Sequence, residues 1–141
     1  MAISTRFSVA VHILVLIDSE RSKQITSDHI AASVGTNPVV IRRIMSLLKK
    51  AGILHSSPGL SATYLTRSPA EISLYQIYTA VEGSKQLFDM HKNPNPNCFV
   101  GANIQAALDE TFIAAQSKME AELKDVSLED IIHNMPSKTN L

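Results

Sequence analysis

The spacing of hydrophobic residues predicts a mainly helical chain with one small β element. Residues 5–18 are apolar on nearly every side, as expected of a helix packed between other elements. Residues 38–51 instead concentrate their apolar side chains on one face, and residues 103–124 carry only a narrow apolar stripe. Two short segments of β-forming composition, 53–56 and 62–66, flank a Pro-Gly turn and predict a two-stranded wing.

Boundary signals divide the first half of the chain into a helix-turn-helix. Thr26 suits an N-cap, so a short helix is predicted from about Ser27 up to Gly35, which ends it. Asn37 and Pro38 then start the next helix, because Asn caps well and Pro loses nothing at the first helical position. Two helices joined by a short turn that contains glycine make a helix-turn-helix.

Beyond the wing, the sequence predicts three more helices. A capping box at Ser73 and Gln76 starts a helix that runs to about Glu82, and a loop rich in Asn and Pro follows. The long helix of residues 103–124 comes next, and a last helix starts at about Ser127. The stripe on the long helix has steps of three and four, which suit packing against the same helix of a second copy. Its members are Ile104, Leu108, Phe112, Ala115, Met119 and Leu123.

These elements predict a fold class that is mainly α with a small β-wing. The expected architecture is a winged helix-turn-helix plus a long C-terminal dimerisation helix. We assign residues 1–83 to the winged DNA-binding domain, 84–102 to a loop, 103–135 to the dimerisation helices and 136–141 to a flexible tail.

Charge is distributed unevenly, although the chain is neutral overall. Residues 1–67 hold eight basic and three acidic residues, a formal charge of +5, and residues 68–141 hold five basic and ten acidic residues, a charge of −5. This asymmetry predicts a polyanionic partner for the first half only. Double-stranded DNA is the polyanion that a helix-turn-helix fits.

The helix of residues 38–51 has the composition expected of a helix that contacts DNA bases. Its predicted buried face consists of Ile41, Ile44, Met45 and Leu48. The opposite face combines an apolar tip, two Arg, a hydroxyl and two Lys, namely Val39, Arg42, Arg43, Ser46, Lys49 and Lys50. Arg can pair with guanine in the major groove, Val can contact a thymine methyl, and Lys and Ser can hold phosphates. The alternative is the solvated basic face of an ordinary helix, but the neighbouring glycine turn and wing favour DNA binding.

The start of this helix is a candidate phosphate site. Thr36, Asn37 and the free amides of Val39 and Val40 are predicted to cradle a phosphate. The alternative is that Thr36 and Asn37 serve only as helix caps.

The wing offers hydroxyl groups but no cations. Ser56, Ser57, Ser61 and Thr63 are candidate donors to phosphates. Because no Arg or Lys lies between Lys50 and Arg67, strong insertion into the minor groove is not predicted.

Catalytic and metal-binding motifs do not occur in the sequence. The five histidines form no His-x-x-x-His pair, and no Gly-x-Ser-x-Gly or Gly-rich phosphate loop is present, so we expect neither an enzyme nor a cofactor. The single Cys98 excludes an internal disulfide and an all-cysteine metal cage, which indicates a cytoplasmic protein. Near a helix start, Cys98 is either a redox sensor with a lowered pKa or an inert thiol. The apolar run from Val9 to Ile17 is too short for a bilayer, so no membrane partner is expected.

Three stretches of the chain resemble the Rrf2 family of winged-helix regulators, of the IscR, NsrR and CymR type. They are Ile30–Ile44, Leu48–Leu54 and Ile72–Glu82, and the resemblance extends over nearly the whole chain. The resemblance implies a homodimeric repressor in which the long helices pack together and each winged domain binds one half-site of a near-palindrome.

The chain departs from the family pattern in two places. Members with an iron-sulfur cluster hold it with three cysteines before the long helix, whereas this chain has only Cys98 there. A cluster is therefore not expected. The turn within residues 57–62 also lacks the Gly-rich sequence with a basic residue that the family tends to carry, so no operator preference is transferred.

Three hypotheses for function follow. The first is a sequence-specific DNA-binding transcriptional regulator. The second is a winged helix used as a protein-interaction module, in which the basic face docks an acidic partner. The third is a regulator that senses redox state through oxidation of Cys98.

Overall fold

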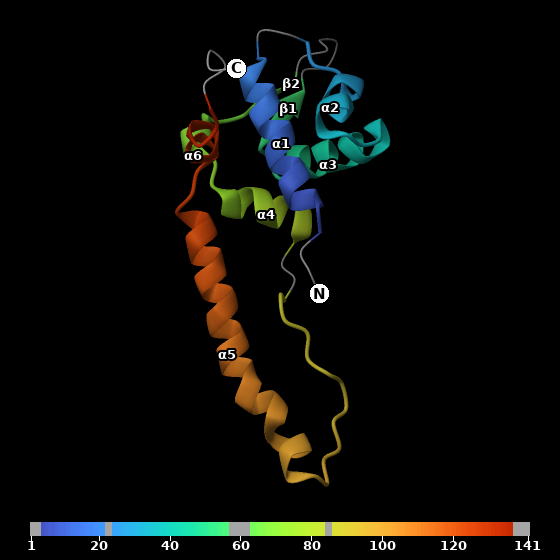
Figure 1. The fold of residues 1–141 in the computed structure, drawn as a ribbon, viewed down its shortest axis with the longest axis vertical. Helices are drawn as coiled ribbons and strands as arrows, with labels where there is room; N and C mark the ends of the chain where they lie inside the picture. Colours follow the sequence, from blue (N-terminus) through green and yellow to red (C-terminus); the bar gives the residue numbers. More distant parts are fainter. Residues whose placement is uncertain (1–3, 22–23, 57–62, 84–85, 137–141) are drawn as a thin grey trace.

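Helices and a small antiparallel sheet form the winged domain (Figure 1). The structure, a computed structural model, describes residues 4–21, 24–56, 63–83 and 86–136. In chain order the elements of this domain are α1 (Arg6–Ser19), α2 (Ser27–Val34), α3 (Pro38–Lys50), β1 (Leu54–Ser56), β2 (Thr63–Leu65), the 3-10 helix η1 (Pro69–Glu71) and α4 (Leu74–Glu82). The two strands pair antiparallel, which confirms the predicted mainly helical fold with a two-stranded wing.

Helix α1 lies at the centre of the winged domain. It contacts α2, α3, α4 and β2, which explains why its apolar residues occur on nearly every side. Its fully or almost fully buried residues are Ala10, Ile13, Leu14 and Ile17. Helix α3 contacts α1 through the predicted face, formed by Ile41, Ile44, Met45 and Leu48.

The ends of the short helices are set by local hydrogen bonds. The Thr26 hydroxyl accepts a hydrogen bond at 3.1 Å from the third residue of α2, as its N-cap role predicts. Gly35 ends α2 with φ of +82°, a conformation that side chains with a Cβ rarely adopt. Ser73 and Gln76 form the predicted reciprocal capping box at the start of α4. Local sequence therefore defines the helix-turn-helix and the start of α4.

Helix α5 (Phe99–Lys124) projects away from the winged domain (Figure 1). It begins at Phe99 and not at about residue 103, so the prediction that residues 99–102 belong to a loop is wrong. Asn103 lies inside α5, where its side-chain amide donates to the backbone oxygen of Phe99 at 2.7 Å. Gly101 lies inside α5. A Cβ there would clash with the backbone oxygen of Asn95, where the preceding segment passes close to the helix.

Helix α6 (Leu128–His133) returns to the winged domain. The backbone N–H of Leu74 donates to the oxygen of Val126 at 2.9 Å, and the N–H of Leu128 donates to the oxygen of Ile72 at 2.8 Å. The Leu128 side chain is fully buried in the core that α1 and α3 share. The sequence analysis grouped residues 103–135 as dimerisation helices. The packing instead places α6 with the winged domain. The pairing partner of this segment lies more than fifty residues away, and helical periodicity does not reveal it.

Truncating the side chain that anchors α6 should destabilise the winged domain. We expect Leu128→Ala to lower the free energy of unfolding by about 2–5 kcal/mol, because it removes buried methyl groups and leaves a cavity. Urea unfolding followed by circular dichroism measures the change. Met135→Ala is the control, since Met135 is 51% exposed and its loss should cost less than about 0.5 kcal/mol. Equal effects of the two substitutions would show that Leu128 does not anchor α6.

Candidate nucleic-acid interface

The outer face of α3 is a solvent-exposed, basic surface. Figure 1 shows α2 and α3 on the side of the winged domain opposite α6. All six predicted residues of this face are exposed, namely Val39, Arg42, Arg43, Ser46, Lys49 and Lys50. Because the apolar residues of α3 recur at steps of three and four, burying them turns the basic residues outward. We call these six residues the α3 outer face.

The two arginines of the α3 outer face have different surroundings. Arg42 donates from Nη1 to the Oγ of Ser27 at 3.4 Å, which directs it toward the first turn of α2. Arg43 makes no hydrogen bond or ion pair within the described ranges. Its guanidinium keeps all five donors available for an external acceptor.

The start of α3 differs from the predicted phosphate cradle. The N–H of Val39 donates to Oδ1 of Asn37 at 2.8 Å, and the N–H of Val40 donates to the backbone oxygen of Asn37 at 3.0 Å. The prediction that these two amides are free is therefore wrong, because Asn37 caps the helix and engages both. Thr36 is half-buried, and its N–H donates to the oxygen of Ala31 at 3.0 Å. What remains at this end is the partial positive charge of the helix dipole.

In the wing, Thr63 has a role inside the sheet. Its hydroxyl forms a hydrogen bond of 2.9 Å with the hydroxyl of Ser56, directly opposite on β1. This cross-strand bond stabilises the strand pair and engages the hydroxyl that was predicted to contact phosphate. Ser57 and Ser61 lie outside the described residues.

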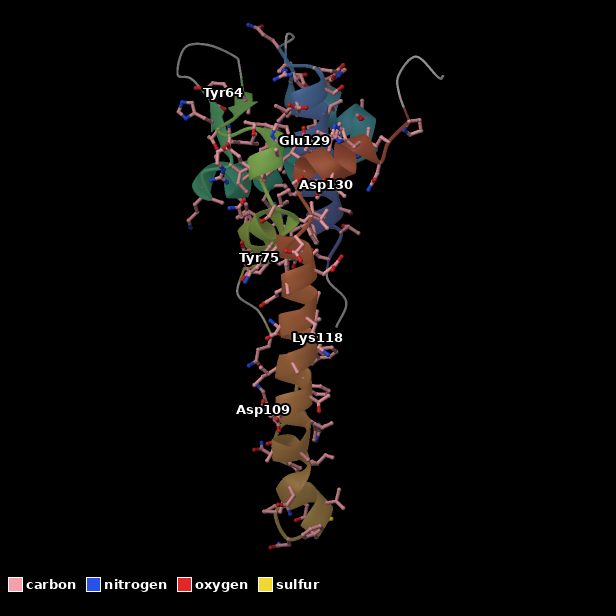
Figure 2. All side chains as sticks on the ribbon, turned by 90° about the vertical axis from the view of Figure 1, so that its left-hand side faces the viewer. Tyr64, Tyr75, Asp109, Lys118, Glu129 and Asp130 are labelled. Atoms are coloured by element: carbon pink, nitrogen blue, oxygen red, sulfur yellow. The ribbon has the colours of Figure 1, made fainter. Side chains whose placement is uncertain are left out.

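The wing also carries an exposed aromatic pair that the sequence analysis missed. His55 and Tyr64 face each other across the sheet, with ring centroids 5.3 Å apart. Figure 2 shows Tyr64 at the outer edge of the winged domain. The alternation of side chains along each strand was the signal that could have found this pair, since positions 55 and 64 both point away from the core.

The predicted dimerisation stripe on α5 is only partly covered within the chain. Phe112 stacks on Phe88 with ring centroids 4.9 Å apart, and the N–H of Leu87 donates to Oε1 of Gln116 at 2.9 Å. The other stripe residues are exposed or half-buried, namely Ile104, Leu108, Ala115, Met119 and Leu123. None of the residues of α5, all of which the structure describes, is fully buried. At the start of α5 another apolar side chain is uncovered, since Phe99 is 83% exposed.

Cys98 lies at the N-cap of α5 and is exposed. The backbone N–H groups of Gly101 and Val100 stabilise its thiolate and lower the pKa of the thiol. Within the described part of the chain, no three His, Cys, Asp or Glu side chains lie close enough together to hold a metal ion. None of the described helices is long and apolar enough to cross a membrane.

A basic helix face on a helix-turn-helix, next to a two-stranded wing, defines a winged-helix DNA-binding protein. The model of the Rrf2 family, described as iron-dependent transcriptional regulators, matches residues 3–134. The chain belongs to the Rrf2 family, whose members are transcriptional regulators and not enzymes.

The descriptions of proteins similar to this chain are consistent with the Rrf2 family. YwnA of Bacillus subtilis (strain 168), which is named as an HTH-type transcriptional regulator, is 50% identical over 133 residues, covering 94% of this chain and 98% of YwnA. A crystal structure described as that of a DNA-binding protein is 48% identical with a TM-score of 0.74, covering 90% of this chain and 98% of that one. CymR (YrzC), the global cysteine regulator of B. subtilis, has a TM-score of 0.72 at 19% identity over 96% of this chain and 99% of its own, which shows a shared fold.

The iron in the family description does not fit the residues of this chain. Cys98 is the only cysteine in the sequence, so one chain cannot supply the cysteine ligands of an iron-sulfur cluster. The described residues also provide no group of three His, Cys, Asp or Glu around it. We therefore derive no step that depends on iron.

The position of Cys98 leads to a pH prediction. We expect its thiol to titrate at lower pH in the folded protein than in the unfolded chain, because the amides of α5 stabilise the thiolate only when the helix is formed. The rate of iodoacetamide alkylation, followed across pH in buffer and in urea, measures both midpoints. Cys98→Ser should show no alkylation. Coincident midpoints would mean that the start of α5 does not act on the thiol.

Proposed function

We propose that this protein regulates transcription as a homodimeric repressor, in which each winged domain binds one half-site of a near-palindromic operator. The observation that carries the proposal is the α3 outer face, which presents two arginines and two lysines to solvent. A recognition helix enters the major groove and contacts base edges mainly through its N-terminal residues. In α3 those residues include Val39, Arg42 and Arg43, whereas Lys49 and Lys50 lie in the last turn.

The surroundings of the basic residues suggest a division of roles. Arg43, which has no partner within the described residues, is proposed to donate to O6 and N7 of a guanine. Arg42 lies toward the first turn of α2, an element that borders the phosphate backbone when α3 is in the groove. Lys50 at the end of α3 is proposed to neutralise a phosphate. A structural relative that is 48% identical is described as a DNA-binding protein, which supports DNA as the partner.

Substitutions on α3 should separate base recognition from phosphate binding. Arg43→Ala should weaken binding to an operator selected from random DNA by about 1–3 kcal/mol and relax one base position. Lys50→Ala should weaken selected and scrambled duplexes alike and lower the salt dependence of the logarithm of the binding constant by about one. Fluorescence anisotropy over a range of salt concentrations measures both.

Lys118→Ala is the matched control, because Lys118 lies on α5, remote from α3 (Figure 2). It should leave binding unchanged. If Arg43→Ala reduced affinity equally for selected and scrambled DNA, the base-reading role would be wrong. A weak salt dependence on duplex DNA would favour the protein-interaction module instead.

The homodimer is proposed to form along α5. This helix leaves an apolar stripe uncovered outside the contact between Phe112 and Phe88. A two-fold dimer places the same surface of both copies in contact, and a near-palindromic operator has matching symmetry. The excess of acidic residues after residue 67 keeps this half away from DNA phosphates.

A pair of identical substitutions on α5 tests the dimer. Ala115 lies within the stripe and Ala121 on the opposite side of the helix, and both are exposed in the single chain. We expect Ala115→Glu to raise the dimer dissociation constant about tenfold or more, because it places a carboxylate in an apolar contact. Ala121→Glu should leave it nearly unchanged. Sedimentation velocity at several protein concentrations measures both, and equal dissociation of the two variants would contradict the assigned face.

A further inference from the structure

Two arginines outside the α3 outer face border one cavity beside the wing. The cavity has a volume of about 280 Å³ and lies between the end of α1, the strand β2 and the start of η1. Arg21 follows α1, and Arg67 follows β2. The fold therefore places two arginines that are more than forty residues apart in the sequence on the lining of the same cavity, and Arg67 also borders a neighbouring recess next to Gln76 and Thr79.

Neither arginine is neutralised within the chain as far as the structure describes it. Arg21 and Arg67 are exposed, and no hydrogen bond or ion pair involves either of them among the described residues. Asp18 also borders the cavity, yet its carboxylate lies beyond the 4.0 Å of an ion pair with either arginine. Two cations and one anion leave the cavity with an excess of positive charge.

The rest of the lining combines donors with an apolar wall. The hydroxyls of Tyr64 and Ser68 can each donate a hydrogen bond. Ile17, which is buried, and Leu65, which is half-buried, provide apolar contact beside them. A recess lined by a few polar groups and an apolar wall is the usual form of a small-molecule site, and a planar guanidinium matches the two oxygens of a carboxylate or phosphate.

We propose that this cavity binds a small organic anion, a molecule with one or two carboxylates or a phosphate on a short carbon body. Arg21 and Arg67 bind the oxyanion, Tyr64 and Ser68 donate to its oxygens, and the carbon body lies against the apolar wall. The volume is at the lower end of the roughly 300–1,000 Å³ of common ligand pockets, so the ligand has only a few carbon atoms. A DNA phosphate is also an anion, but it brings no apolar body to contact Ile17 and Leu65.

Calorimetric titration of the full chain at constant ionic strength tests the proposal. The probes are succinate, glycerol 3-phosphate and inorganic phosphate, and the neutral control is succinamide. We expect saturable binding of one molecule per chain for succinate or glycerol 3-phosphate, weaker binding of inorganic phosphate, which has no carbon body, and none of succinamide. Arg21→Gln and Arg67→Gln should each weaken this binding about tenfold or more, since each removes a charged hydrogen-bond donor. Lys118→Gln, which removes an exposed cation on α5, should leave it unchanged.

Two results would overturn the proposal. One is the absence of saturable binding by both succinate and glycerol 3-phosphate to a wild-type chain whose thermal unfolding shows that it is folded. The other is binding that Arg21→Gln and Arg67→Gln leave unaltered. If no anion binds but both variants lower the salt dependence of duplex DNA binding by about one, the cavity holds a DNA phosphate instead. The calorimetric titration contains no DNA, so its outcome is independent of the proposed operator binding.

Discussion

The packing of α3 against α1 is the contact on which the rest of the winged domain depends. Ile41, Ile44 and Leu48 occupy the same buried cluster as the central residues of α1. An amphipathic helix has only one orientation that removes such a stripe from water, so this contact also determines which residues face outward. The basic surface is thus a consequence of core burial, and it needs no separate interaction to hold it in place.

The same core determines where the second half of the chain begins and ends. Helix α4 packs against α1 and α3 before the chain leaves the domain, and Leu128 enters the core when the chain returns. Between these two points, α5 makes few contacts with the winged domain apart from those with α4. Its stability as an isolated projection is limited, because most helical stability in proteins comes from tertiary packing of an apolar face. This is a physical reason to expect a second chain along α5.

Features with a local cause could be predicted from the sequence, and features with a distant cause could not. Thr26, Ser73 and Gln76 act on amides within three residues of themselves, so their caps follow from short sequence signals. The buried face of α3 likewise follows from its own periodicity. In contrast, the presence of Gly101 inside α5 depends on the approach of Asn95, and the engagement of Thr63 depends on its partner across the sheet. The cavity at Arg21 and Arg67 was missed because residues distant in sequence create it.

The return of the chain at Leu128 has a mechanical consequence for assembly. Helix α5 is joined to the winged domain both through its contact with α4 and through the buried segment that follows Asp125. A projection attached at one point would pivot, whereas attachment at two points resists rotation about the junction. If two such helices associate, the distance and angle between the two α3 helices are set by rigid geometry and not by linker length. The spacing of the DNA sites that such an assembly tolerates would then be narrow.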